Sequence, residues 1–254
     1  MRTRDQVLAL ERAAFDAWQA EEIVALGPWR LRFMQGVTDR ANSVWAGPGE
    51  PPGGFDDAIA RVEAFYAERR RPVLFQITPA ADELDARLAA RGYERYDDVS
   101  VQIASAARVA QLAPNAEACA QCDARLSAAW FELSGRRGRF RGEQVAVYRA
   151  FLERVAPRAG FASARPAGAT ALAAVGLTLV APPLAGVFSM LTLPEQRGRG
   201  LAAAVLAALA RFAAARGAAQ LYLQVSANNA AARALYSRAG FSEAYRYHYR
   251  RRAL

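Results

Sequence analysis

The spacing of apolar residues divides the first part of the chain into helices and strands. Val7–Ala20 carries apolar residues at helical spacing, and Trp29–Phe33 alternates large apolar residues with arginines, as a half-buried strand does. Further strands are expected at Ile23–Leu26, Asn42–Trp45, Val73–Thr78 and Tyr96–Ala104, and further helices at Asp56–Arg70 and Ala81–Arg91. The order is helix, strands, helix, strand, helix, strand.

The same order of elements recurs in the second part of the chain. Helices are expected at Ala116–Ser134, Glu143–Ala156 and Ala230–Ala239, with an alanine-rich helix after Gly200, and strands at Thr170–Ala174, Gly176–Val180, Leu184–Leu193, Leu221–Val225 and Ser242–Arg250. This repeat predicts an α/β (α+β) protein of two tandem domains, residues 1–105 and 116–254, with a linker at 106–115.

Composition fits a globular chain with two cores, since 53% of the 254 residues are hydrophobic. No apolar run approaches the roughly 20 residues of a membrane span. The first residues lead into a helical pattern without the apolar segment of a signal peptide, so a cytoplasmic location is expected and no membrane contact.

Charge and cysteine usage exclude several classes of site. The formal net charge is +9 and all 33 basic residues are arginine, but they are dispersed, which argues against nucleic-acid binding. Cys119 and Cys122 form a lone C-x-x-C, which we interpret as two reduced thiols on successive turns of a helix. With His248 as the single histidine, no metal site is expected.

A glycine-spaced basic loop has the features of a phosphate-binding site. It follows a predicted strand and opens the alanine-rich helix, with Gly198 and Gly200 between Arg197 and Arg199. Glycine permits the tight turn, arginine supplies fixed positive charge, and the first N–H groups of the helix have no intrahelical partner. Such a loop can bind the phosphates of a ligand.

Two segments together resemble the GNAT superfamily of acyltransferases, the relatives of the Gcn5 N-acetyltransferase. Arg197-x-x-Gly200-x-Ala202 is similar to the superfamily's acyl-CoA signature, and Asn229-x-x-Ala232-x-x-Leu235-Tyr236-x-x-x-Gly240-Phe241 to its downstream segment. The resemblance covers the chain well from Cys119 to Arg252 and the first half only in plan. It implies two tandem GNAT-like domains, each a mixed, mostly antiparallel sheet flanked by helices.

The resemblance also implies roles for individual residues. The backbone from Arg197 through Gly198, Arg199, Gly200, Leu201 and Ala202 to Ala203 would bind the pyrophosphate of CoA, and Met190–Thr192 its pantetheine arm. A backbone N–H near Leu191 or Thr192 would face the thioester oxygen. Asn229 would contact the CoA arm, and it could also be the N-cap of the helix that begins at Ala230. Tyr236 would protonate the leaving thiolate.

No residue is assigned as the general base, because the strand before the loop has no carboxylate. Ser189 and Gln224 could order a water molecule, and Glu132 could reach the site from the preceding helix. In the first half, Arg40, Asn42 and Trp45 could contact the acceptor or form a solvated strand edge.

The first half lacks the phosphate-binding loop. Gly47–Gly54 contains two consecutive prolines and Glu50 instead, so this copy is expected to be degenerate and not to bind CoA. The resemblance therefore implies an N-acetyltransferase that uses acetyl-CoA, or another short acyl-CoA, and an amine acceptor by direct attack. The alternative is a non-catalytic acyl-CoA sensor or scaffold. The acceptor stays open between a small amine, a peptide N-terminus and a protein lysine, and we expect a monomer or weak dimer.

Overall fold

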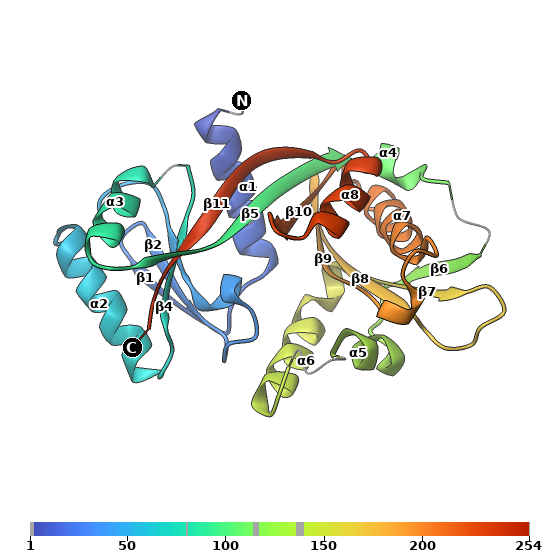
Figure 1. The fold of residues 1–254 in the computed structure, drawn as a ribbon, viewed down its shortest axis with the longest axis horizontal. Coiled ribbons are helices and arrows are strands. Elements are labelled where there is room, and N and C mark those ends of the chain that lie inside the picture. Colours follow the sequence, from blue (N-terminus) through green and yellow to red (C-terminus); the bar gives the residue numbers. More distant parts are fainter. Residues whose placement is uncertain (1–2, 80, 114–116, 136–139, 254) are drawn as a thin grey trace. The chain divides into compact units, whose positions relative to one another are not determined.

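The computed structural model describes residues 3–79, 81–113, 117–135 and 140–253, which form two compact units (Figure 1). Unit 1 contains the chain up to Ser100, the short segment Ser226–Asn228 and the chain from Tyr245 onward. Unit 2 contains Val101–Val225 and Asn229–Ala244. Among the described residues, none of the helices has the length and apolar character needed to cross a membrane.

Unit 1 is a mixed sheet with its core on the side of α2. Its helices are α1 (Arg4–Ala17), α2 (Gly54–Glu68) and α3 (Asp82–Ala90), and its strands are β1 (Glu22–Leu26), β2 (Trp29–Phe33), β3 (Val44–Ala46), β4 (Val73–Ile77) and parts of β5 (Glu94–Ser105) and β11 (Ser242–Arg252). Strands β1, β2 and β3 pair antiparallel, β3 and β4 pair parallel, and β11 pairs antiparallel with β4. Between the parallel strands runs α2, which buries Ile59, Val62 and Tyr66 against Trp29 and Phe75.

Unit 2 repeats this plan with a larger sheet. Its helices are α4 (Ala106–Ala110), α5 (Ala128–Gly135), α6 (Glu143–Val155), α7 (Leu201–Ala214) and α8 (Ala230–Arg238), and its strands are β6 (Ala118–Asp123), β7 (Ala159–Pro166), β8 (Ala174–Ala181), β9 (Leu184–Thr192) and β10 (Gln220–Ser226). Strands β6 to β9 pair antiparallel in sequence order, and β9 pairs parallel with β10. As α2 does in unit 1, α7 joins the two parallel strands.

Helices cover both faces of the unit 2 sheet. Neighbouring residues of a strand point to opposite faces. On β7, Gly160 faces α7, because a Cβ there would lie 2.5 Å from the Phe212 ring. The next residue, Phe161, packs its ring 5.2 Å from that of Trp130 on α5. The helices α5 and α7 therefore lie on opposite faces, and α6 lies on the side of α5 (Figure 1), where Tyr148 stacks near Phe131.

Two expectations about unit 2 were wrong, and one of its strands was not predicted. Most of the helix expected at Ala116–Ser134 is instead the strand β6 followed by α5, so Cys119 and Cys122 lie on a strand and not on helical turns. The strands expected at Thr170–Ala174 and Gly176–Val180 are one strand, β8, which begins at Ala174 and forms its hairpin with β9. The strand β7 was not expected at all; its small residues allow α7 to approach closely.

The compact units differ from the expected domain boundaries at two places. Residues of the expected linker form α4, whose Ala106 and Val109 are buried in the core of unit 2. In addition, the strands β5 and β11 are each divided, since β5 belongs to unit 2 from Val101 and β11 belongs to unit 1 from Tyr245. Each unit thus contains strand residues that lie beyond the sequence boundary expected for it.

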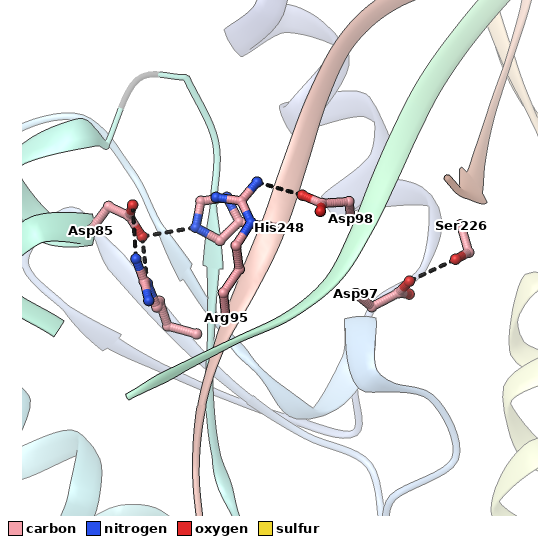
Figure 2. A network of polar contacts seen from close by, with 7 residues as sticks. Asp85, Arg95, Asp97, Asp98, Ser226 and His248 are labelled. Carbon is pink, nitrogen blue, oxygen red and sulfur yellow. Dashed lines mark hydrogen bonds and ion pairs between the residues drawn. The ribbon is translucent and has the colours of Figure 1, made fainter. Parts of the chain in front are cut away.

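The segment Ser226–Asn228 and the single histidine are tied into unit 1 by carboxylates (Figure 2). The Ser226 hydroxyl donates to Asp97 at 2.6 Å. On β11, His248 Nε2 lies 2.8 Å from Asp85 on α3, and Arg250 Nε donates to the same oxygen at 2.7 Å. Asp85 therefore connects α3 to the last strand of the chain.

Burial alone would raise the pKa of Asp85, but the hydrogen bonds from Arg250 and His248 outweigh it, and the pKa is lowered. The stability that this carboxylate contributes is therefore present above the unfolded-state pKa of about 3.9 and is lost as the pH falls through the lower folded-state pKa.

We expect Asp85→Asn to destabilise the protein at pH 7 by about 1–3 kcal/mol, because a charged acceptor of two donors is removed. The Asp85→Asn variant should also lose less stability than the wild type when the pH falls from 5 to 2. Urea unfolding at several pH values measures both. Asp57→Asn, which changes an exposed i,i+4 pair at 3.9 Å, is the matched control and should behave like the wild type. Equal pH dependence of the Asp85 variant and the wild type would contradict this assignment.

Candidate active site

The loop between β9 and α7 ends in a helix start that carries no side-chain cap. After one 3-10 turn at Pro194–Gln196, Gly198 and Gly200 adopt positive φ angles of 78° and 72°, which glycine adopts without strain. Gly200 is the N-cap of α7, so no side chain accepts from the first N–H groups of the helix, and no acidic residue lies in its first turn. These N–H groups are available for an anion.

The two arginines of the loop differ in their contacts. Arg199 donates to Gln196 at 2.9 Å and lies 4.0 Å from Glu117, so part of its charge is already paired. Arg197 is exposed and has no ion-pair partner among the described residues. Its guanidinium can therefore turn toward a phosphate without breaking an ion pair.

The corresponding helix start in unit 1 lacks these properties. Gly53 caps α2 with a φ of 81°, but Asp56 and Asp57 occupy the first turn of that helix. Their charges repel an anion at the helix start. Pro51 and Pro52, directly before the cap, have no N–H to donate. The anion-binding geometry is therefore present at α7 and absent at α2.

The strand β9 leaves its parallel neighbour halfway along its length. Its register with β10 runs from Leu184 opposite Gln220 to Val187 opposite Leu223, and β9 continues from Phe188 to Thr192 beyond it. On its other edge, β9 stays paired with β8 up to Thr192 opposite Ala174. The far half of β9 thus has an edge that is available for an extended ligand.

The register with β8 indicates which backbone groups face this edge. The Leu193 N–H donates to the Ala173 carbonyl at 2.9 Å, so it points toward β8. Backbone groups alternate in direction along a strand. The N–H and C=O of Thr192 therefore point away from β8, and the N–H of Leu191 points toward it.

A β-bulge interrupts the same half of β9. The pairs Val175 with Leu191 and Leu177 with Phe188 leave Gly176 alone opposite Ser189 and Met190. Ser189 takes up the extra length with a positive φ of 49°. A bulge of this kind redirects nearby backbone groups and often occurs beside active sites. The Met190 side chain lies on the α7 face, since its sulfur would be 2.6 Å from a Cβ at Gly176.

The helix α8 carries the two downstream candidates. Asn229 is its N-cap and accepts from the Ala232 N–H at 3.1 Å, which confirms the expected capping role. Tyr236 is 7% exposed and belongs to the same core as Leu201 and Val205 of α7, with Met190 packed against that core. Its hydroxyl makes no hydrogen bond to the residues that the structure describes. Burial raises the pKa of Tyr236 to about 12, so the phenol stays protonated at neutral pH.

The remaining candidates divide between the two units. In unit 2, Ser189 lies at the bulge, Gln224 is half-buried on β10, and Glu132 is exposed on α5 between the buried residues Phe131 and Leu133. Their role toward an acceptor stays a prediction. The sequence did not indicate the contact between Ser189 and Tyr148, whose hydroxyl groups lie 3.1 Å apart. Neither a positive φ at serine nor this pairing has a sequence signal.

Arg40, Asn42 and Trp45 belong to unit 1 and do not form a solvated strand edge, so that interpretation was wrong. Arg40 and Asn42 lie in the 3-10 turn Asp39–Asn42, and Trp45 lies on β3, which is between β2 and β4. Asn42 is buried, accepts from the N–H groups of Met34 and Gly36, and donates to the Thr38 carbonyl. Trp45 is buried and donates to Glu11 at 3.1 Å. Asn42 and Trp45 thus stabilise the interior of unit 1.

A buried polar network surrounds Glu11 in unit 1. Glu11 accepts from Trp45, Gln76 and Tyr245, and Gln76 also accepts from Arg32 at 2.9 Å. Desolvation raises the pKa of Glu11 despite these donors, and it lowers the pKa of the buried Arg32. The network joins α1, β2, β3, β4 and β11. Its polar groups are hydrogen-bonded to one another.

Comparison with known proteins shows the family. Residues 5–250 match the family described as "Probable histone acetyltransferase Rv0428c C-terminal". The chain is 31% identical over 248 residues to a Bacillus subtilis protein named "Uncharacterized N-acetyltransferase YobR", covering 97% of this chain and 98% of that protein.

Solved structures share the fold. A GCN5-related N-acetyltransferase from Kribbella flavida superposes with a TM-score of 0.63 at 17% identity, over 96% of this chain and 91% of that one. A tandem GNAT protein from the clavulanic acid biosynthesis pathway superposes with a TM-score of 0.64 at 17% identity, over 83% of this chain and 74% of that one. The chain belongs to the Rv0428c C-terminal acetyltransferase family, within the GNAT superfamily.

Proposed function

We propose that the protein transfers the acetyl group of acetyl-CoA to an amine acceptor by direct attack, and that unit 2 carries the site. Membership in an acetyltransferase family makes the chain an enzyme, so catalysis takes precedence over the sensor alternative. The observation that carries the proposal is the far half of β9. It is open on one edge, bulged at Ser189, and leads directly into the uncapped start of α7.

Donor binding follows from these three features. The N–H groups from Arg197 to Ala203 and the Arg197 guanidinium would hold the pyrophosphate of CoA, with Arg199 adding its positive charge to the loop. The open edge of β9 from Met190 to Thr192 would pair with the amides of the pantetheine arm, and Asn229 would lie beside this arm at the start of α8. In unit 1, Asp56 and Asp57 at the start of α2 oppose such binding, which supports unit 1 as the degenerate copy.

The chemistry requires an oxyanion donor and an acid. As the amine attacks the thioester carbon, negative charge develops on the carbonyl oxygen, and a backbone N–H on the open edge of β9 would stabilise it. The register favours Thr192 over Leu191 for this role, because the Leu191 N–H points toward β8. Tyr236 would give its proton to the departing sulfur. The amine attacks in its neutral form and releases its proton to water.

A screen for CoA release tests this function. The purified chain would be incubated with acetyl-CoA and a panel of primary amines: glucosamine, spermidine, a tripeptide with a free N-terminus, and a histone-tail peptide with internal lysines. At least one class should raise CoA release well above the amine-free rate. The same compounds with their amines already acetylated are the matched controls and should give the background rate. Background release with every free amine would contradict the proposal.

A further inference from the structure

The bulge on β9 holds a serine in a backbone conformation that serine rarely adopts. Ser189 has a φ of 49°, in the left-handed region where only glycine, asparagine and aspartate are common. Phe188 and Leu191 on either side of the bulge stay in register with β8. The conformation is therefore fixed by the strand pairing, and it directs the Ser189 side chain toward α6 while Met190 points toward α7.

The partner of this serine is a tyrosine packed among three phenylalanines. Tyr148 on α6 is fully buried, and its ring lies 4.3 Å from that of Phe140, 6.1 Å from Phe131 and 6.5 Å from Phe151. The Tyr148 hydroxyl lies 3.1 Å from the Ser189 hydroxyl, so a buried phenol places a fixed polar atom against the bulge. Aromatic packing holds the ring, and the hydrogen bond holds the serine.

We propose that Tyr148 is a positioning residue that orients Ser189 as the hydrogen-bond acceptor for the incoming amine. This rests on the proposed function. A serine hydroxyl has one proton and two lone pairs. With one of these sites committed to Tyr148, the others point away from the aromatic cluster, and a lone pair can accept from an amine N–H. The amine lone pair is then directed at the thioester carbon.

The proton and electron balance needs no group beyond those already assigned. The amine nitrogen forms the new bond to carbon, and the carbon–sulfur bond breaks. The thiolate takes a proton from Tyr236, and the proton lost by the amine passes to water, which also restores Tyr236. Ser189 and Tyr148 keep their own protons and contribute orientation alone. This division of roles fits a site whose β9 strand carries no carboxylate.

Two variants and their combination test the pair. Tyr148→Phe keeps the ring and removes its hydroxyl, and Ser189→Gly removes the side chain while tolerating the positive φ. Tyr93→Phe is the matched control, because it removes a partly buried phenol that donates to Glu63 at 2.8 Å in unit 1. Steady-state rates would be measured with acetyl-CoA and each amine of the panel, together with the melting temperature with and without acetyl-CoA.

We expect each single variant to lower kcat about five- to tenfold, the usual effect of one hydrogen bond. The double variant should lose no more than Ser189→Gly alone, because Tyr148 acts only through Ser189. KM for acetyl-CoA and the rise in melting temperature should stay within twofold of the wild type. Should Tyr148→Phe fold poorly, Ser189→Gly alone must still show the loss in kcat.

Several outcomes would overturn the proposal. Wild-type kcat in either well-folded single variant, losses that multiply in the double variant, or a loss confined to acetyl-CoA affinity would each do so. Acetyl-CoA binding without transfer to any amine would also remove the role of the pair while leaving the donor site intact. If acetyl-CoA does not raise the melting temperature of the wild type, the proposed function itself fails.

Discussion

Replacing Tyr236 with phenylalanine is expected to lower kcat about 100-fold while leaving the affinity for acetyl-CoA within twofold of the wild type. General acids contribute about 10²–10⁴-fold, and the lower end applies because a thiolate is a good leaving group. Burial raises the pKa of Tyr236 to about 12, so the proton donor is present throughout the neutral range. The ring stays in its core position beside Phe241, 5.8 Å away, so packing should be kept.

The measurement is a steady-state comparison with an acceptor that the screen identifies. Tyr222→Phe is the matched control, since Tyr222 is a buried tyrosine of the same unit that packs on Phe188. The control should turn over like the wild type. A Tyr236→Phe enzyme with full kcat would remove this residue as the acid, whereas a loss found only in acetyl-CoA affinity would assign it to donor binding.

Ending the chain after Ala244 is expected to abolish cooperative folding of unit 1. This truncation removes the residues of β11 that pair with β4, His248 to Arg252, and the buried side chains of Tyr245, Tyr247 and Tyr249. Burial of one such side chain is worth about 1.5–3 kcal/mol, so the three together approach the total stability of a typical domain, about 5–15 kcal/mol. Glu11 would also lose the donor Tyr245 and remain buried.

Urea unfolding followed by near-ultraviolet circular dichroism, together with limited proteolysis, measures this effect. A chain that ends after Arg252 keeps all of β11 and is the matched control. The control should unfold like the full chain, and the shorter chain should expose residues 3–100 to protease. An unchanged unfolding transition in the shorter chain would show that unit 1 does not need the last strand.

Local sequence patterns predicted most helices and strands but failed where small residues dominate. The segment Ala118–Asp123 contains two alanines and a glutamine, which favour a helix, yet it pairs with β7 as a strand, so tertiary pairing outweighs propensity. β7 itself consists largely of alanine, glycine and serine, because α7 packs so closely that a Cβ at Gly160 would meet Phe212. Because β7 contains few large apolar residues, the apolar pattern did not predict it.

The division of β5 and β11 between the units had no local signal. The strands are long, with 12 residues in β5 and 11 in β11, but nothing in either sequence marks a division. Only the pairing of β11 with β4 shows where the end of the chain belongs. The sequence repeat therefore predicted the order of elements in each half. It placed the domain boundary between the two repeats along the sequence, whereas the compact units are defined by which strands pack together.

The candidate site could be predicted in its backbone features and not in its side-chain pairing. Glycines at 198 and 200 and the arginine between them indicated the uncapped helix start, which the structure contains. The bulge at Ser189 and its bond to Tyr148 depend on the register of β8 with β9 and on the packing of α6, which lie far apart in sequence. Such pairings follow from tertiary structure alone.

Thermal unfolding with and without acetyl-CoA tests most directly whether unit 2 binds the donor. At 100 times Kd, a ligand stabilises the folded state by about 2.7 kcal/mol, which raises Tm by several degrees. Arg197→Glu should abolish the rise, because it places a negative charge at the helix start, whereas Arg125→Glu, an equal charge change at an exposed residue before α5, should keep it. We expect a clear rise in the wild type and in Arg125→Glu only. An unchanged wild-type Tm at millimolar acetyl-CoA would contradict it.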